Sequence, residues 1–387
     1  MVEFLRYLLF LSLLCAWLTA FAQGVGLDNS DYEKEIAAIE KELMEELSVW
    51  DSSTDLRLGG GYKENVTLSA FAEESSPFVS TGLDFIAIRV PLAEDGVEVM
   101  VFGALDNRHY LDAEAVDSEQ SGLLNVSLEK SLAERWQLKT DFRVIYIDEM
   151  FDASLTEDDI GTVQVVGKQV SLAPALRWDL PANTWIEAEP EVSRQYFADP
   201  LDDYLEVGGR VSAGVDYGFQ SELLLYAETV RRDYDTRSQR DEIGFYMPNT
   251  DLGYDRPEHG IEWTHYWDSK RRVRMRTRYS MLENEDSGSG YFDYWRERVS
   301  HGWRYRGDSW SVSVTVRKAI YEYELQRSAD FLDLRQRADL SWDITVGYEY
   351  NDHLTFQLGY EQESINSNVP QDEYRYRIYT AGIDWEF

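Results

Sequence analysis

The stretch Tyr379-Thr-Ala-Gly-Ile-Asp-Trp-Glu-Phe387 decides the fold. Apolar or small side chains occupy its odd positions, and polar or small ones lie between them. Because the side chains of a strand alternate between its two faces, this strand has one dry face and one wet face. A soluble sheet rarely leaves such an aromatic strand at a free edge, which would invite aggregation. In a closed barrel the last strand pairs with the first and no edge remains, so we expect a barrel.

This strand resembles the C-terminal assembly signal of Gram-negative outer-membrane β-barrels. The resemblance implies that the barrel-assembly machinery recognises the apolar face of the strand, which carries Tyr379, Ile383, Trp385 and Phe387. It also implies that the protein resides in the cell outer membrane, in contact with lipid and lipopolysaccharide.

A second resemblance lies near the start of the predicted barrel. The segment Gly61-Tyr-Lys-Glu-Asn-Val66, followed by Ser75-Ser-Pro-Phe78, resembles the first strand of uncharacterised porin-like barrels. Those proteins have a Gly-Tyr-Asp-x-Asn-Val segment. In this chain Lys63 stands at the position of the aspartate. We take from this resemblance the architecture and the porin-like class, and no particular solute.

Residues Met1 to Ala22 have the layout of a secretory signal peptide. Arg6 precedes an apolar run from Tyr7 to Leu18, and small residues follow at the expected cleavage position. The single cysteine, Cys15, lies inside this segment. Once the segment is removed, neither a disulfide nor a thiolate metal site can form. We predict no metal site and no cofactor.

The composition argues against two classes of protein. With 37 basic and 72 acidic residues the net charge is −35, which opposes binding to nucleic acids. After the signal segment, no stretch approaches the roughly 18 to 20 consecutive apolar residues that a membrane helix needs. A membrane protein with this sequence must cross the bilayer with strands, and its charges must lie in the lumen and the loops.

A helical pattern precedes the strands. Between Asp31 and Trp50 apolar side chains recur at spacings of three and four, which is typical of an amphipathic helix. A helix of this length is marginal alone, so it would pack on a second copy, on the barrel mouth or on another periplasmic protein, or remain a loosely ordered leader. The expected organisation is a signal peptide over 1–22, a periplasmic leader over 23–53 and one outer-membrane barrel over 54–387.

From Thr54 onward the pattern has a period of two, which predicts strands. Predicted strands such as Trp136 to Ile147 follow short turns, and longer polar connections separate the pairs, over 111–120, 148–162, 233–258 and 364–373. Outer-membrane barrels alternate short periplasmic turns with longer external loops. Counting back from Phe387, we expect an all-β fold, a transmembrane antiparallel β-barrel of about 16 strands. The first strand should be Leu56 to Ala72, and the range is 14 to 18 because 233–258 could hide a hairpin.

The predicted lipid-facing side chains are apolar from strand to strand. Examples are Leu124, Val126, Leu128, Leu138, Phe142, Val144, Val312, Val314 and Val316. Aromatic side chains collect near strand ends, as at Trp136, Trp178, Trp310 and Tyr348. These positions fit the aromatic girdles of a membrane barrel. A soluble β-sandwich would also alternate, but it would not need so many aromatic residues beside its turns.

The segment Arg272-Val-Arg-Met-Arg-Thr-Arg278 is the sharpest internal feature. Its arginines share one face, and an arginine facing lipid at the membrane midplane costs about 2 to 4 kcal/mol. That face must therefore be the lumen. The expected basic wall of a pore consists of Arg272, Arg274, Arg276, Arg278, Arg296, Arg298, Arg304, Arg317, Arg335 and Arg337.

The segment Trp185-Ile-Glu-Ala-Glu-Pro-Glu-Val192 carries the opposite charge at inward positions, at Glu187, Glu189 and Glu191. About half a barrel turn should separate these glutamates from the arginines. Two walls of opposite charge would create a transverse field across an aqueous lumen, an arrangement that resembles general porins. Alternatively, the charges pair with one another and with inward acids such as Glu262, Asp339 and Asp343, and merely fill and rigidify the lumen.

Three function classes remain to be weighed. We predict a porin-like passive channel for small hydrophilic solutes, either monomeric or homo-oligomeric. A non-transporting scaffold, or an accessory in polysaccharide export or envelope tethering, is the alternative. An enzyme is disfavoured, and we predict no catalytic residues, because none of the five histidines lies in a catalytic motif. We expect His265 and His301 to face lipid beside Trp263 and Trp303.

Overall fold

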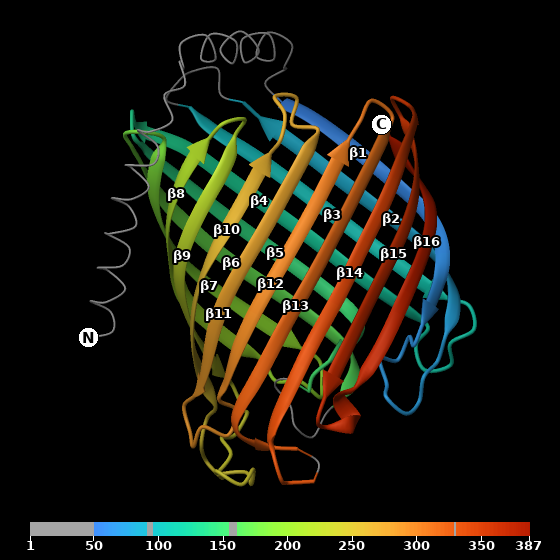
Figure 1. Ribbon diagram of the computed structural model, residues 1–387, viewed down its shortest axis with the longest axis vertical. Coiled ribbons are helices and arrows are strands. Elements are labelled where there is room, and N and C mark those ends of the chain that lie inside the picture. Colours follow the sequence, from blue (N-terminus) through green and yellow to red (C-terminus); the bar gives the residue numbers. More distant parts are fainter. Residues whose placement is uncertain (1–49, 91–95, 155–160, 329) are drawn as a thin grey trace.

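The computed structural model describes residues 50–90, 96–154, 161–328 and 330–387. These residues form a closed antiparallel barrel of sixteen tilted strands (Figure 1). The expected signal peptide over 1–22 lies outside the described residues, as does the expected helix from Asp31 onward, apart from Trp50. The prediction of about 16 strands is confirmed.

The strands follow one another around the barrel in chain order. They are β1 (Trp50–Glu64), β2 (Ser76–Arg89), β3 (Val97–Tyr110), β4 (Ser118–Ala133), β5 (Trp136–Asp152), β6 (Thr162–Leu180), β7 (Thr184–Phe197), β8 (Tyr204–Tyr217), β9 (Ser221–Tyr234), β10 (Gly253–Tyr266), β11 (Val273–Asp286), β12 (Tyr294–Arg306), β13 (Trp310–Arg327), β14 (Leu334–Asn351), β15 (Leu354–Ser367) and β16 (Tyr374–Glu386). A single 3-10 turn, η1 (Pro370–Asp372), precedes β16.

The barrel closes because β16 pairs with β1 along most of both strands. Their register runs from Asp55 opposite Glu386 to Glu64 opposite Arg377. Closure gives every strand two hydrogen-bonded neighbours, so no edge is left to meet lipid. No helix among the described residues has the length and apolar character needed to cross a bilayer.

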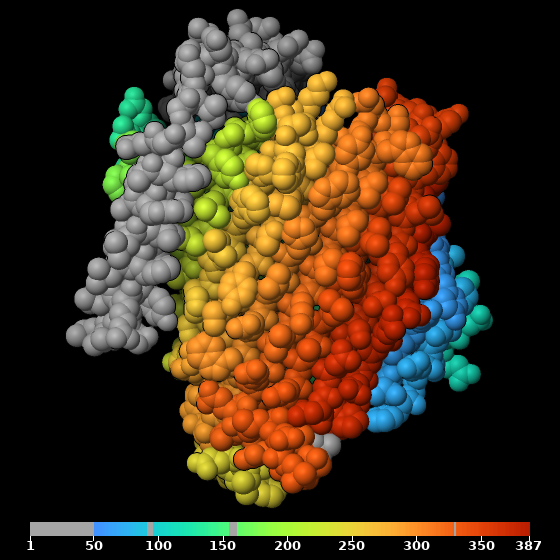
Figure 2. Space-filling view, in the orientation of Figure 1, coloured from blue at the N-terminus to red at the C-terminus, as the bar shows by residue number. Residues whose placement is uncertain are grey.

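One face of each strand forms an apolar outer wall. Leu124, Val126 and Leu128 lie opposite Val144, Phe142 and Thr140, and Leu124, Leu128 and Phe142 expose 41%, 41% and 39% of their surface. The predicted lipid-facing side chains therefore share the outer face of the barrel. Figure 2 shows the outer surface of the later strands. Soluble proteins rarely expose an apolar surface of this extent, whereas a membrane barrel requires one.

Aromatic pairs mark the rim of this apolar wall. Trp136 stacks on Trp178 with ring centroids 5.5 Å apart, and Trp310 packs on Tyr348 at 4.8 Å. All four residues lie at or near an end of their strand, and all at the same end of the barrel. An apolar belt with an aromatic rim is the architecture of an outer-membrane β-barrel, which places this protein in the outer membrane.

The two ends of the barrel differ. At the turn end, connections such as 134–135, 181–183 and 352–353 are short, and the C-terminus lies there (Figure 1). At the loop end the connections are mostly longer, and the longest covers 235–252. It contains an isolated bridge between Arg240 and Tyr246, so the suspected hairpin in 233–258 amounts to one bridge and adds no strand.

The first strand differs from the expected Leu56 to Ala72. Trp50 pairs with Arg89 at the start of β1, so the strand begins before the expected barrel boundary at Thr54, and Trp50 belongs to a strand. β1 ends at Glu64 because Asn65 and Leu68 adopt positive φ angles of 51°. The Asn65 side chain accepts a hydrogen bond from the Ser69 backbone, which turns the chain inward.

The C-terminal residues occupy the predicted face. Tyr379, Trp385 and Phe387 expose 43%, 45% and 71% of their surface, and Ile383 shares their parity, opposite Leu58 of β1. Recognition of this face by the assembly machinery stays a prediction.

Gly61 is required by the close approach of β1 and β16. A Cβ atom at this position would lie 2.0 Å from the carbonyl oxygen of Tyr379 and 2.7 Å from the ring of Phe78. Replacing Gly61 with alanine should therefore strain the seam and destabilise the folded barrel by about 1–3 kcal/mol. The measurement is the temperature at which the heat-modifiable band of the purified barrel is lost.

Gly103→Ala is the matched control, because its Cβ would meet nothing closer than 3.8 Å. Equal unfolding temperatures for both variants would show that the seam tolerates a side chain at Gly61.

Candidate functional site

The inner face of the barrel is identified by contacts that cross it. Arg337 of β14 lies 2.7 Å from Asp152 of β5, although β15, β16, β1, β2, β3 and β4 separate these strands along the shorter path around the ring. Only the lumen allows such a contact. The face of β14 that carries Arg337 is therefore interior, and cross-strand pairing extends this assignment to every other strand.

Part of the predicted basic wall is neutralised by two acids of β10. Arg276 pairs with Glu262 at 2.6 Å. Glu258 forms ion pairs with Arg278 at 3.0 Å and with Arg296 at 2.6 Å. At these positions the interpretation of a structural charge network is correct.

Other arginines of the wall form no direct ion pair with a described residue. Arg274 of β11 lies directly opposite Arg304 of β12 on the inner face, an arrangement of like charges that is unfavourable. Arg298 and Arg317 point to the same lumen from β12 and β13. Within the described residues none of these four forms an ion pair. Arg272 lies in the turn before β11, where it pairs with Asp308 at 2.8 Å.

The predicted acidic wall forms no direct ion pair with a described residue, although Arg177 and Arg210 lie opposite Glu187 and Glu189 on the neighbouring strands. Glu187, Glu189 and Glu191 of β7 lie on the inner face opposite Ser212, Arg210 and Gly208. The Arg210 guanidinium stacks on the ring of Tyr226, 3.9 Å from its centroid. None of the three glutamates forms an ion pair with a described residue. The acidic strand lies four to six strands from the basic ones, so the separation is less than the expected half turn.

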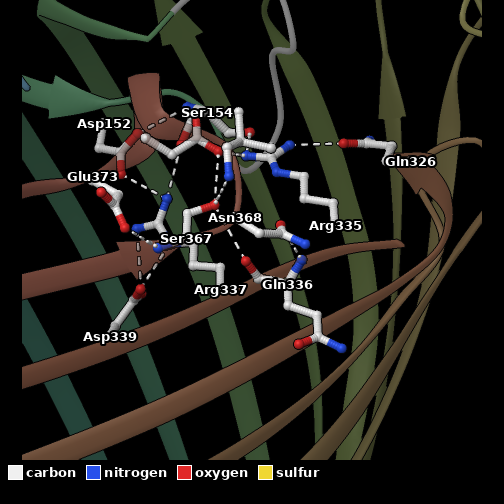
Figure 3. Close-up of polar contacts among 12 residues, drawn as sticks. Asp152, Ser154, Gln326, Arg335, Gln336, Arg337, Asp339, Ser367, Asn368 and Glu373 are labelled. Carbon is white, nitrogen blue, oxygen red and sulfur yellow. Dashed lines mark hydrogen bonds and ion pairs between the residues drawn. The ribbon is translucent and has the colours of Figure 1, made fainter. Parts of the chain in front are cut away.

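Arg335 and Arg337 have a different position from the one predicted. They lie at the loop end in a network with Asp152, Ser154 and Asp372, which we call the mouth bridge (Figure 3). Their side chains are only 5% and 3% exposed. They belong to a buried contact across the mouth and do not line a free wall.

The mouth bridge fastens the end of β5 to β14 and to η1. Arg337 contacts Asp152 at 2.7 Å and donates to the Ser154 hydroxyl at 2.8 Å. Arg335 contacts Asp372 at 2.5 Å and donates to the Ser154 carbonyl at 3.0 Å. Removing one partner from a buried ion pair costs about 3–5 kcal/mol, so this contact is held firmly.

A second buried network lies beside the mouth bridge and escaped the sequence analysis. Lys63 of β1 contacts Glu119 of β4 at 2.8 Å, and both side chains are almost fully buried. Glu119 also accepts hydrogen bonds from Arg108 at 3.0 Å and Tyr110 at 2.5 Å. The lysine that departs from the porin-like pattern therefore has a specific acidic partner, but no local sequence signal links two residues so far apart.

The outer face carries the histidines that were expected there. His265 lies within hydrogen-bonding distance of Tyr217 at 3.1 Å and packs against Trp263 and Trp267. His301 contacts Thr277 at 2.9 Å on the same face. Among the described residues no three His, Cys, Asp or Glu side chains are grouped as a metal site.

Asp293 at the loop end has a carboxyl group whose pKa is raised. It lies in the connection 287–293, outside the membrane-spanning strands. Burial, together with the nearby charges of Asp286, Glu324 and Glu285, raises the pKa of its carboxyl to about 6, although the carboxyl accepts a hydrogen bond from the Asp286 backbone.

Asp293→Asn should raise the thermal unfolding midpoint at pH 8 and leave it unchanged near pH 4. The folded state binds the proton more tightly than the unfolded chain, whose aspartate pKa is about 4, so the stability from this group is lost as the pH rises from about 4 to about 6. Asparagine removes the negative charge and keeps a side-chain oxygen that can accept the hydrogen bond from the Asp286 backbone. Midpoints measured at both pH values test this, and an equal effect at both would contradict it.

Three solved structures show the degree of similarity to known proteins. Acinetobacter baumannii OccAB4 aligns over 88% of this chain and 99% of its own, with a TM-score of 0.46 and 9% identity. Pseudomonas aeruginosa OprD aligns over 87% of this chain and 94% of its own, with a TM-score of 0.45 and 11% identity. Vibrio cholerae OmpT aligns over 88% of this chain and 99% of its own, with a TM-score of 0.43 and 9% identity. No protein-family model and no curated protein sequence matches the chain. The assignment of the fold therefore rests on the strand pairing of the chain itself.

Proposed function

We propose that this barrel is a passive outer-membrane channel for small hydrophilic solutes. The observation that carries the proposal is a set of inner-face charges that form no ion pair with a described residue. They are Glu187, Glu189 and Glu191 on β7 and Arg274, Arg298, Arg304 and Arg317 on β11 to β13. An unpaired charge is costly away from water. Side chains such as Arg298 and Glu189 are therefore hydrated, and the lumen holds water at their level.

The charge balance sets the expected selectivity. Arg274, Arg298, Arg304 and Arg317 favour anions locally, whereas the chain as a whole carries a net charge of −35. The acidic excess is larger, so the channel prefers cations weakly. The mouth bridge narrows the path at the loop end and limits the size of the solute.

A non-transporting barrel is the second candidate. The buried contacts at the loop end favour it, because Arg335, Arg337, Lys63 and Glu119 all lie in packed ion pairs. Single-channel recording of the purified barrel in planar bilayers separates the two functions. Discrete conductance steps support the channel, and their absence supports the scaffold.

The triple variant Arg274→Gln, Arg298→Gln and Arg304→Gln should increase cation preference. These side chains form no ion pair, so the substitutions remove positive charge without leaving an acid unpaired, and the repulsion between Arg274 and Arg304 disappears. Reversal potentials under a salt gradient measure the change. The effect should shrink at high salt, because charges are screened over about 10 Å at 0.1 M.

The corresponding triple lysine variant is the control, because it keeps the charge and should keep the wild-type reversal potential. An unchanged potential in the glutamine variant would refute a field-bearing lumen.

The double variant Arg335→Gln and Arg337→Gln should increase single-channel conductance. It removes the cations that hold Asp152 and Asp372 together, so the end of β5 is released from the opposite side of the mouth. Arg377→Gln is the control, because Arg377 pairs with Glu64 at 3.0 Å on the outer face. Unchanged conductance in a folded double variant would show that the mouth bridge does not limit the current.

A further inference from the structure

A hollow with an apolar floor opens on the inner face of β2 to β5. It has a volume of about 320 Å³ and is lined by seven residues. The apolar floor consists of Ile86, Met100, Phe102, Leu123 and Ile145. The polar groups are Asn125 and Arg143. This volume is at the lower end of the range for small-molecule sites.

Strand register shows that these side chains share the inner face. Ile86, Phe102, Asn125 and Arg143 follow one another as directly opposed residues across the four strands. Leu123 lies opposite Ile145 in the adjoining inner row. The hollow is therefore a built feature of the sheet, formed by neighbouring rows of inward side chains.

The floor differs from the charged parts of the inner face. There, side chains such as Glu187 and Arg298 require water. The floor side chains are only partly buried, so some of their apolar surface faces the lumen. Covering that surface with an apolar group releases water and is favourable at roughly 25 cal/mol per Å².

Arg143 supplies the hollow with a free cationic group. Its side chain is exposed and forms no hydrogen bond or ion pair with a described residue. The nearest acid on its own strand, Asp141, is already paired with Lys139 at 3.0 Å. Glu191 of β7 attracts it only over a longer distance. A guanidinium in this state can donate two parallel hydrogen bonds to a carboxylate.

Asn125 adds an unsatisfied acceptor next to Arg143. Its side-chain oxygen is buried and has no hydrogen-bond partner, which is rare enough to need an explanation. The terminal torsion of asparagine is soft, so the amide can turn toward a hydroxyl or amino donor in the hollow. A ligand with such a donor would satisfy it.

We infer that this hollow binds small amphipathic monoanions, in which an alkyl or aryl body carries one acidic group and a hydroxyl or amino donor. The apolar body covers Phe102 and its neighbours, the acid pairs with Arg143, and the donor reaches Asn125. A single cationic group in a barrel of net charge −35 favours one negative charge over two. The inference goes beyond passive passage, because binding can be measured whether or not the barrel conducts.

The test is equilibrium binding to the folded barrel in detergent. The probes are 4-hydroxyphenylacetate, tyramine, which has the same body with a cationic group, and acetate, which lacks the body. Saturation-transfer NMR, with empty micelles as the blank, measures each of them. We expect 4-hydroxyphenylacetate to bind in a way that depends on Arg143, and tyramine and acetate to give no signal that depends on Arg143.

Arg143→Gln should weaken binding of 4-hydroxyphenylacetate roughly tenfold, as expected for the loss of a charge-assisted pair. The side chain is exposed, so the variant keeps its fold, which heat-modifiability checks. Asn125→Ala should reduce the advantage of 4-hydroxyphenylacetate over phenylacetate.

Two results would overturn the inference. Wild-type affinity for 4-hydroxyphenylacetate in Arg143→Gln would show that the hollow does not recognise the anion. An equal loss of affinity in Arg298→Gln, on the basic wall, would show that binding follows the charge of the lumen as a whole. Both results leave the channel proposal standing, because conductance is measured separately.

Discussion

Satisfying backbone hydrogen bonds in a medium without water is the constraint on which this structure depends. A strand in lipid cannot leave its amide groups unpaired, so β1 and β16 must meet, and they do so from Asp55 to Glu64. That closure imposes the close approach at Gly61 and sends alternate side chains to lipid and to the lumen. The placement of the charges follows from it, because an arginine on the outer wall would face hydrocarbon.

The lumen uses its charges in two ways. Near the loop end and along β10 they are paired and buried, as between Glu258 and Arg296. The glutamates of β7, and Arg274, Arg298, Arg304 and Arg317 on β11 to β13, form no ion pair with a described residue and need water. The two interpretations drawn from the sequence, a field and a rigid network, therefore describe different parts of one inner surface, and the boundary between them is set by which strands supply acids to their neighbours.

The sequence predicted the number of strands and their faces because these depend on local alternation. It could not predict Arg337 against Asp152 or Lys63 against Glu119, because these partners are far apart in sequence and meet only once the barrel closes. The hollow on β2 to β5 was missed for another reason. The run Val99-Met-Val-Phe102 is apolar on both faces, so Met100 and Phe102 do not stand out as lumen residues.

The mouth bridge also divides the rim. It joins β5 to β14, so the remaining strands fall into two arcs, one from β15 through β1 to β4 and the other from β6 to β13. Any opening at the loop end lies on one side of this crossbar or the other. One arc holds the buried pair of Lys63 and Glu119, and the other holds the buried pair of Glu258 and Arg296. The crossbar therefore separates two halves of the rim that differ in chemistry.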